Sequence, residues 1–199
     1  MDVEELHQLA TADRWVFVIG RIATDAVAMD AALRGVHASL RGRDDRNALL
    51  EAPDGWSATM RECVDKLSAH DLDDTMRSAI RAALDDAGRA WSDRNRYMHD
   101  LLVDSIDVDD EPPTIERESR AEDDRYRLRL ARKKNAPEHE TVSLDDAINL
   151  VLALVAARWR LRAARSFLTN RSTVWRGMLV GHVQGSWDGN ADWISADDV

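Results

Sequence analysis

Cysteine is nearly absent from this sequence: Cys63 is the only one in 199 residues. A single thiol cannot form an intramolecular disulfide, and it cannot build a thiolate-rich metal site, which needs several cysteines. Such cysteine usage is typical of the reducing cytosol. We therefore expect a cytoplasmic protein in which Cys63 is a core residue.

Long hydrophobic runs are missing as well. The most apolar stretch, residues 147–157, is too short to span a bilayer and contains Asn149. The first residues, MDVEEL, are acidic, whereas targeting segments are basic. These features predict a soluble protein that does not associate with a membrane.

Positive charge is in short supply. The chain has 27 Lys and Arg against 37 Asp and Glu, a formal net charge of −10. Bulk binding of nucleic acid depends on clustered basic side chains that displace counterions from phosphates, so the composition excludes it. Any nucleic-acid contact must be local. Residues 125–134 and 147–187 are basic without a single acidic residue; their arginines either guide single-stranded RNA or are solvated and pair with the acidic helices.

The common cofactor and metal signatures are absent from the sequence. It has no phosphate-cradling GxxxxGK, no dinucleotide-binding GxGxxG and no GxSxG turn around a nucleophilic serine. His139-Glu140 lacks the second histidine of a zinc-protease helix. The carboxylates of residues 104–111 lack the ligand order and central glycine of a calcium loop. We expect neither a cofactor nor a metal.

What the sequence does contain is a hydrophobic period of three to four residues, which predicts amphipathic helices. The first predicted helix is kinked near Gly20. The last begins with a capping box formed by Ser143 and Asp146. The four predicted helices cover residues 3–40, 56–70, 71–102 and 144–168.

A different pattern separates the third and fourth predicted helices. Residues 104–124 are acidic and contain Pro112-Pro113, which predicts an exposed loop. Apolar residues then alternate with arginines over residues 125–130, and Thr141-Val142 supplies a returning strand. We expect a small β-hairpin, so that loop and hairpin together occupy about residues 104–142.

The predicted fold is all-α: an antiparallel bundle of four main helices with the hairpin inserted between the third and the fourth. This bundle covers residues 1–168. Residues 169–199 are rich in glycine and tryptophan and show no clear period. They predict an irregular C-terminal arm that either docks on the bundle or is partly disordered.

The end of the third predicted helix, WSDRNRYMHD at residues 91–100, holds the candidate site. At 100° per residue, Arg94 and His99 flank the apolar stripe on opposite sides of Trp91. For both side chains of one chain to act on the same substrate atom, the helix end must bend. A two-fold dimer packed through this stripe would instead bring the pairs of both chains together.

Arginine and histidine are complementary for cleaving RNA. A neutral imidazole can take the proton of a ribose 2′-OH, and a protonated one can deliver a proton to a leaving oxygen. A guanidinium cannot act as a base, but its fork of donors suits the charge on phosphate oxygens. Asn95, one turn before His99, is placed to orient the imidazole or the phosphate. This chemistry needs no metal.

The spacing from Arg94 to His99 recurs twice in similar form, from Arg132 to His139 and from Arg176 to His182. Proline or glycine interrupts both of those segments, so only the first pair is predicted to lie on a regular helix. The sequence RNRYMH at residues 94–99 resembles the RNxxxH form of the R-x(4–6)-H motif of the HEPN superfamily. The resemblance extends to the element order over residues 1–168.

This resemblance implies a homodimer with a composite Arg and His site at its interface, and metal-independent RNA cleavage in toxin–antitoxin, abortive-infection or CRISPR-associated defence. In that hypothesis His99 is the general acid or base, Arg94 stabilises phosphate charge, Asn95 positions, and Arg96 and Tyr97 contact the substrate. The expected partners are RNA, a second copy, and an antitoxin or another defence protein.

Two alternatives stay open. The first is a non-catalytic module that binds RNA, a nucleotide or a protein partner through the same surface. The second is a purely structural helical protein, in which Arg94 pairs with a carboxylate of a neighbouring helix and His99 caps the helix end.

Overall fold

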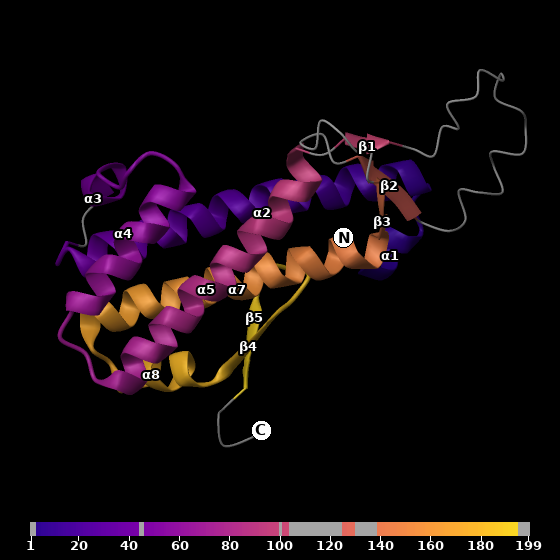
Figure 1. Cartoon of the computed structure of the whole chain (residues 1–199). Helices are drawn as coiled ribbons and strands as arrows, with labels where there is room; N and C mark the ends of the chain where they lie inside the picture. The colour runs from indigo at the N-terminus through magenta and orange to yellow at the C-terminus, as the bar shows by residue number, and fades with distance from the viewer. Residues whose placement is uncertain (1–2, 44–45, 100, 104–124, 130–138, 195–199) are drawn as a thin grey trace, which may run out of the picture.

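The computed structural model describes residues 3–43, 46–99, 101–103, 125–129 and 139–194, and there the chain is mostly helical (Figure 1). The acidic loop predicted for residues 104–124 lies outside the described residues. The elements, in chain order, are α1 (Val3–His7), α2 (Thr11–Leu40), α3 (Arg46–Leu50), α4 (Trp56–Ala69), α5 (Asp74–His99), β1 (Leu101–Val103), β2 (Arg125–Arg129), β3 (His139–Ser143), α7 (Leu144–Asn170), α8 (Thr173–Val180), β4 (His182–Gly185) and β5 (Ala191–Ile194).

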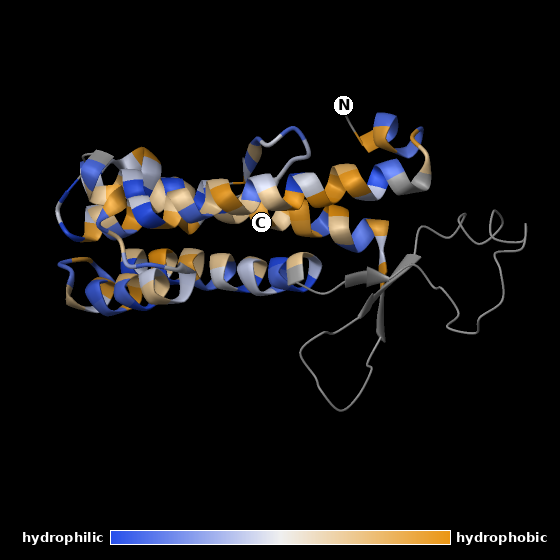
Figure 2. Ribbon diagram, turned by 90° about the horizontal axis from the view of Figure 1, so that it is seen from above, coloured by the Kyte–Doolittle hydropathy of each residue, from blue (hydrophilic) through white to orange (hydrophobic). Residues whose placement is uncertain are grey.

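Four long helices form the body of the molecule. Helices α2 and α7 lie along one another, and α5 packs on both (Figure 1). Figure 2 shows polar and apolar residues mixed along the helices, and α7, which packs on both α2 and α5, buries apolar side chains along its length from Leu144 to Leu168. The expectation that the chain is mostly helical is confirmed. The fully buried core side chains include Ile22, Met29 and Leu33 of α2, Met76, Ile80 and Leu84 of α5, and Leu144, Leu154 and Leu161 of α7.

The first predicted helix is two helices. Helix α1 ends at His7 and α2 begins at Thr11, whereas α2 runs through Gly20 without a break. The Arg14 guanidinium holds the connection, because it donates to the carbonyl oxygens of Leu9 and His7 at 2.7 Å each. In a continuous helix, backbone N–H groups four residues later would donate to these carbonyl oxygens, and here the Arg14 side chain takes their place. The prediction of one helix over residues 3–40 with a kink near Gly20 was wrong.

Helix α5 is shorter than predicted at both ends. It begins at Asp74, because Asp73 precedes it and its Oδ1 accepts a hydrogen bond from the Met76 backbone N–H at 2.9 Å. It ends at His99, and Leu101–Val103 forms β1. A three-residue apolar stretch fits a helix and a strand equally well, so only its pairing with β2 decides the matter.

The inserted sheet has three antiparallel strands in the order β1-β2-β3. Strands β2 and β3 pair with Tyr126 opposite Val142, which confirms that strands lie at both predicted positions. Strand β1 adds Leu102 opposite Leu128. The capping box that opens α7 is also confirmed: Ser143 Oγ accepts from the Asp146 N–H at 3.1 Å, and Asp146 Oδ2 accepts from the Ser143 N–H at 2.9 Å.

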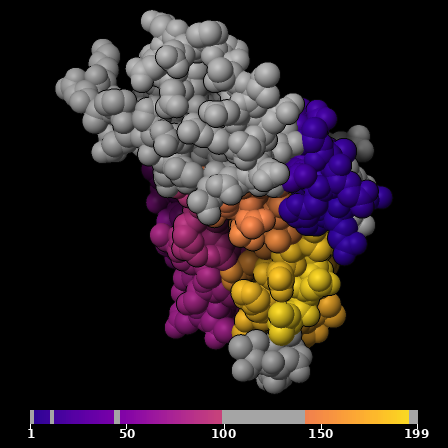
Figure 3. All heavy atoms as spheres, turned by 90° about the vertical axis from the view of Figure 1, so that its right-hand side faces the viewer, coloured from indigo at the N-terminus to yellow at the C-terminus, as the bar shows by residue number. Residues whose placement is uncertain are grey.

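The C-terminal region is regular through residue 194, so the prediction of an irregular arm was wrong. Helix α8 is followed by an antiparallel hairpin, β4–β5, that packs on α7. A Cβ at Gly185 would lie 2.1 Å from the carbonyl oxygen of Leu152, so only glycine permits this approach. Figure 3 shows the resulting face, where the C-terminal segment in yellow lies beside the N-terminal segment in indigo.

A buried ion network fastens this hairpin to the helices. Asp25 of α2 is 4% exposed and accepts from Arg21 at 3.2 Å and from Arg158 of α7 at 2.9 Å. Arg158 also donates to the carbonyl oxygen of Gly189, in the β4–β5 turn, and the Trp159 indole N–H donates to the same oxygen at 3.0 Å. Trp187, between β4 and β5, also docks on α2: its ring centroid lies 6.1 Å from that of Phe17 and 5.0 Å from the Arg21 Cζ.

No helix of the described residues is long and apolar enough to cross a membrane.

Cys63 should be chemically inert in the folded protein. Its side chain is fully buried in α4, and burial raises the pKa of the thiol to about 12. Because the thiolate is the nucleophile, we expect no alkylation by iodoacetamide at about pH 8 in native protein and rapid alkylation in guanidinium chloride. Mass spectrometry measures both rates. A native rate equal to the denatured one would contradict a closed core at Cys63.

Candidate functional site

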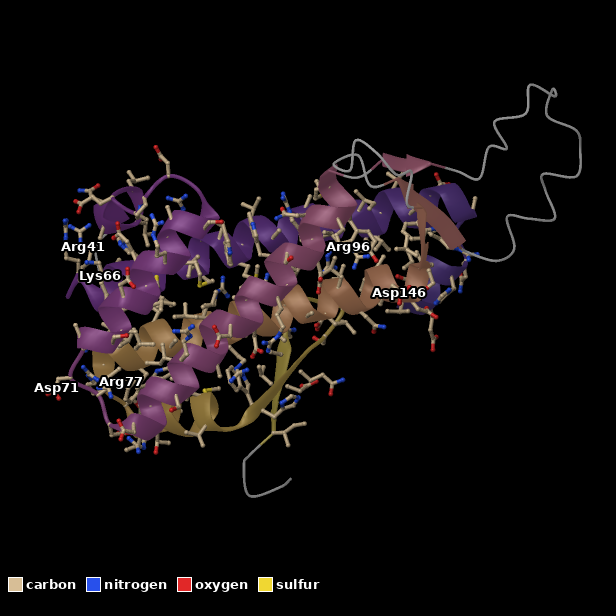
Figure 4. All side chains as sticks on the ribbon, viewed as in Figure 1. Arg41, Lys66, Asp71, Arg77, Arg96 and Asp146 are labelled. Atoms are coloured by element: carbon tan, nitrogen blue, oxygen red, sulfur yellow. The ribbon has the colours of Figure 1, made fainter. Side chains whose placement is uncertain are left out.

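The predicted site residues lie on the last turns of α5. Arg94, Asn95 and Arg96 are half-buried, and Tyr97 is buried. His99 is the last residue of the helix, and its side chain lies outside the described parts of the chain. Figure 4 shows Arg96 at this end of α5, at the same end of the molecule as Asp146 on the first turn of α7.

The Arg94 guanidinium is held by a ring and an amide. Its Cζ lies 4.9 Å from the centroid of the Trp91 ring, one turn earlier on α5. Its Nη1 donates to Asn95 Oδ1 at 3.1 Å. Its Nε is buried and has no hydrogen-bond partner among the described residues. Burial lowers the pKa of Arg94, although an arginine keeps its charge at neutral pH.

Arg94 has no carboxylate partner among the described residues. Other partly buried arginines of the helices do: Arg158 pairs with Asp25, and Arg160 pairs with Asp86 of α5. In α8, the more exposed Arg176 pairs with Asp73. The interpretation that the α7 and α8 arginines pair with the acidic helices is therefore confirmed for these three. The alternative in which a neighbouring carboxylate neutralises Arg94 does not occur in this part of the structure.

Asn95 contacts Arg94 directly. Its side-chain oxygen accepts from Arg94, and its own backbone is one turn before His99 on α5. The amide therefore fixes one edge of the guanidinium without adding negative charge. Because Asn95 occupies Nη1, the edge formed by Nε and Nη2 faces no acceptor among the described residues.

The structure corrects the role predicted for Tyr97. The side chain is 9% exposed and belongs to the hydrophobic core, so its ring offers no surface on which a base could stack. Burial, reinforced by the charge of Asp146, raises the pKa of its hydroxyl to about 12. Tyr97 lies seven residues after the buried Ala90, and this spacing of two helical turns is the signal for core packing. The substrate contact predicted for Arg96 stays a prediction.

The Trp159 ring of α7 is occupied by the C-terminal hairpin and so offers no free face for a base. Its indole N–H is bonded to Gly189, and the guanidinium of Arg162 lies 5.0 Å from its ring centroid. The hairpin was not predicted, and so this use of Trp159 was not predicted either.

Sequence reasoning missed the part played by Trp91 and Trp56. The two indoles stack with ring centroids 4.3 Å apart and planes 4° apart, which joins α4 to the end of α5. The spacing of three residues between Trp91 and Arg94 was a visible signal, since such residues are neighbours on a helix surface. The contact with Trp56 had no local signal.

The described residues contain no group of three His, Cys, Asp or Glu side chains that could hold a metal ion. No protein-family model, curated protein or solved structure matches the chain. The function is therefore inferred from the residues of the site and their geometry.

Proposed function

We propose that this protein is a metal-independent endoribonuclease of HEPN type that acts as a homodimer, with a composite Arg and His site where two antiparallel helical bundles meet. The resemblance of residues 94–99 to the RNxxxH motif supports this proposal, as does the position of the motif at the end of α5. The same resemblance favours a role as a toxin or a phage-defence effector in the cytoplasm.

The observation that carries the proposal is the half-buried Arg94 guanidinium, which has no carboxylate partner in the described part of the chain. Removing a cation from water without a counter-charge is costly, and this chain pairs both Arg158 and Arg160 with aspartates. A cation kept unpaired retains its full attraction for an incoming anion. The guanidinium fork matches the oxygens of a phosphodiester, which makes RNA the best-fitting ligand.

In the proposed reaction the ribose 2′-oxygen attacks phosphorus while the bond from phosphorus to the 5′-oxygen breaks. A histidine takes the 2′-OH proton, and a protonated histidine gives a proton to the leaving 5′-oxygen. The products are a 2′,3′-cyclic phosphate and a 5′-OH. Arg94 stabilises the charge that develops on the phosphoryl oxygens.

Helix geometry supports a second chain. Arg94 and His99 are five positions apart on α5, which separates them by about 140° around the helix axis. One helix cannot direct both side chains at one phosphorus atom without bending. Two helix ends related by a two-fold axis can supply Arg94 from one chain and His99 from the other, and they bring two histidines for the two proton transfers.

Product analysis tests this function. Wild-type protein is incubated in EDTA with 5′-labelled single-stranded RNA and, as the matched control, with the same strand made of 2′-deoxy nucleotides. We expect cleavage of the RNA alone, with 2′,3′-cyclic phosphate ends, from a dimer seen by light scattering. Cleavage that requires added Mg²⁺, or equal cleavage of the deoxy strand, would contradict attack by the 2′-OH.

The second candidate function is a non-catalytic module that binds RNA, a nucleotide or a protein partner of a defence complex. The unpaired Arg94 supports it equally, because phosphate binding does not require a proton-transfer group. Retention of RNA that weakens with rising salt, without new RNA ends, would favour this module over the enzyme.

A further inference from the structure

The guanidinium of Arg94 owes its orientation to Trp91, a residue outside the RNxxxH motif. Its Cζ lies 4.9 Å from the centroid of the Trp91 ring, and the only hydrogen bond of the guanidinium among the described residues is the one to Asn95. We propose that Trp91 is a positioning residue that holds Arg94 ready for the phosphate of RNA, an inference that rests on the proposed ribonuclease function.

An aromatic face suits this task better than a carboxylate does. A carboxylate would neutralise the cation and occupy the same fork that phosphate needs. The ring contacts only the face of the guanidinium, so the in-plane N–H donors stay available. With Nη1 bonded to Asn95 and Nε buried, Nη2 is the donor that remains available to the phosphate.

Trp56 fixes the plane of Trp91 in turn. Trp56 opens α4, is 8% exposed, and stacks almost parallel on Trp91. Because Trp56 belongs to a second helix, the Trp91 indole cannot rotate about its side-chain bonds without losing this stack. The guanidinium is therefore oriented before RNA arrives, and the ordering cost does not fall on the binding step.

Arg94 differs from the other described arginines that lie over a ring. Arg21 and Arg158 both pair with Asp25. Arg162 and Arg171 are exposed. Only Arg94 combines a half-buried guanidinium, an aromatic support and no acidic partner in this part of the chain, which is the combination expected of an anion site and not of a structural clamp.

The test uses Trp91→Leu, which removes the aromatic face, and Trp91→Phe, which keeps one. Trp175→Phe is the matched control, because Trp175 is another half-buried helical tryptophan, and no guanidinium lies over its ring in the described structure. We expect kcat/KM for RNA to fall roughly 3- to 30-fold in Trp91→Leu, less in Trp91→Phe, and not in Trp175→Phe. Circular dichroism confirms that each variant is folded.

A double-mutant cycle separates positioning from a general structural role. Binding of a 2′-O-methyl RNA, which cannot be cleaved by 2′-OH attack, is measured for wild type, Trp91→Leu, Arg94→Ala and the double variant. If Trp91 acts through Arg94, Trp91→Leu weakens binding in the wild type but not in the Arg94→Ala background. An equal loss in both backgrounds overturns the positioning role while leaving the proposed function intact.

An NMR readout needs no RNA. The Arg94 Nε–H resonance, assigned by its loss in Arg94→Ala, should carry a ring-current shift from Trp91 that disappears in Trp91→Leu. If this shift disappears although wild type cleaves no RNA, catalysis is wrong and the positioning of Arg94 stands. If the resonance is unchanged in Trp91→Leu, the inference is wrong whatever the cleavage assay shows.

Discussion

RNA cleavage in EDTA is expected to fall by about two to four orders of magnitude when His99 is replaced by alanine, because general acid–base catalysis contributes that much. Arg94→Ala should cost about two to three orders of magnitude, the usual effect of removing a donor that stabilises transition-state charge. Rates of release of labelled fragments under single-turnover conditions measure both effects. Arg94→Lys should restore only part of the rate, since lysine keeps the charge and loses the fork.

The matched controls come from the same chain. Arg81 lies on α5, is exposed, and pairs with Asp85 four residues later, so Arg81→Ala should leave the rate unchanged. His182 is exposed on β4 and serves as the control for the histidine. Loss of activity in these controls as well would point to unfolding. Full activity of both Arg94→Ala and His99→Ala would exclude the proposed site.

Stability should fall most when Asp25 is replaced by alanine. The Asp25 side chain is 5% exposed and that of Arg158 is 12% exposed, and no other carboxylate is paired with Arg158 in the described structure. Removing one partner of a buried pair leaves the other charge buried, which costs roughly 3–5 kcal/mol. In a chain of this size that corresponds to a Tm lower by about 6–20 °C. Thermal and urea unfolding followed by circular dichroism measure the change.

Asp30→Ala is the control for this prediction. Asp30 pairs with Arg34 on the same helix, at 2.8 Å, but both side chains are about a quarter exposed. A pair of this kind at spacing i, i+4 contributes only about 0.5 kcal/mol or less. Because the Asp25 network also bonds the β4–β5 turn, Asp25→Ala should increase hydrogen exchange in that hairpin and Asp30→Ala should not. Equal Tm values for the two variants would refute the role of the network.

Most of the helical framework could be predicted because its signals are local. The period of the apolar residues placed α4 almost to the residue, and Ser143 with Asp146 placed the start of α7. The alternation after residue 124 placed β2. Two errors arose where a contact longer than one helical turn decides: Arg14 bonds back to His7 of α1, and β1 exists because it pairs with β2.

The candidate site likewise has features that the sequence shows and features that only tertiary contacts decide. Its sequence pattern and its place at a helix end were visible in the sequence, and so was the complementary chemistry of Arg94 and His99. The burial of Tyr97 could have been predicted from its spacing of two helical turns to Ala90, but the neighbouring arginines led to the prediction of a substrate contact. The stack of Trp56 on Trp91 joins two helices and leaves no periodic trace in either.

The sequence by itself determined the main helical segments, to within a few residues at most ends, and where the RNxxxH pattern lies, because helix formation and capping depend on residues within about four positions. Only the tertiary structure decided which arginines are neutralised. Asp25 and Arg158 are 133 positions apart, and their pairing depends on how α2 and α7 pack. The same packing leaves Arg94 beside an indole and without an ion pair to any described carboxylate, and for this reason we propose it as the arginine that binds phosphate.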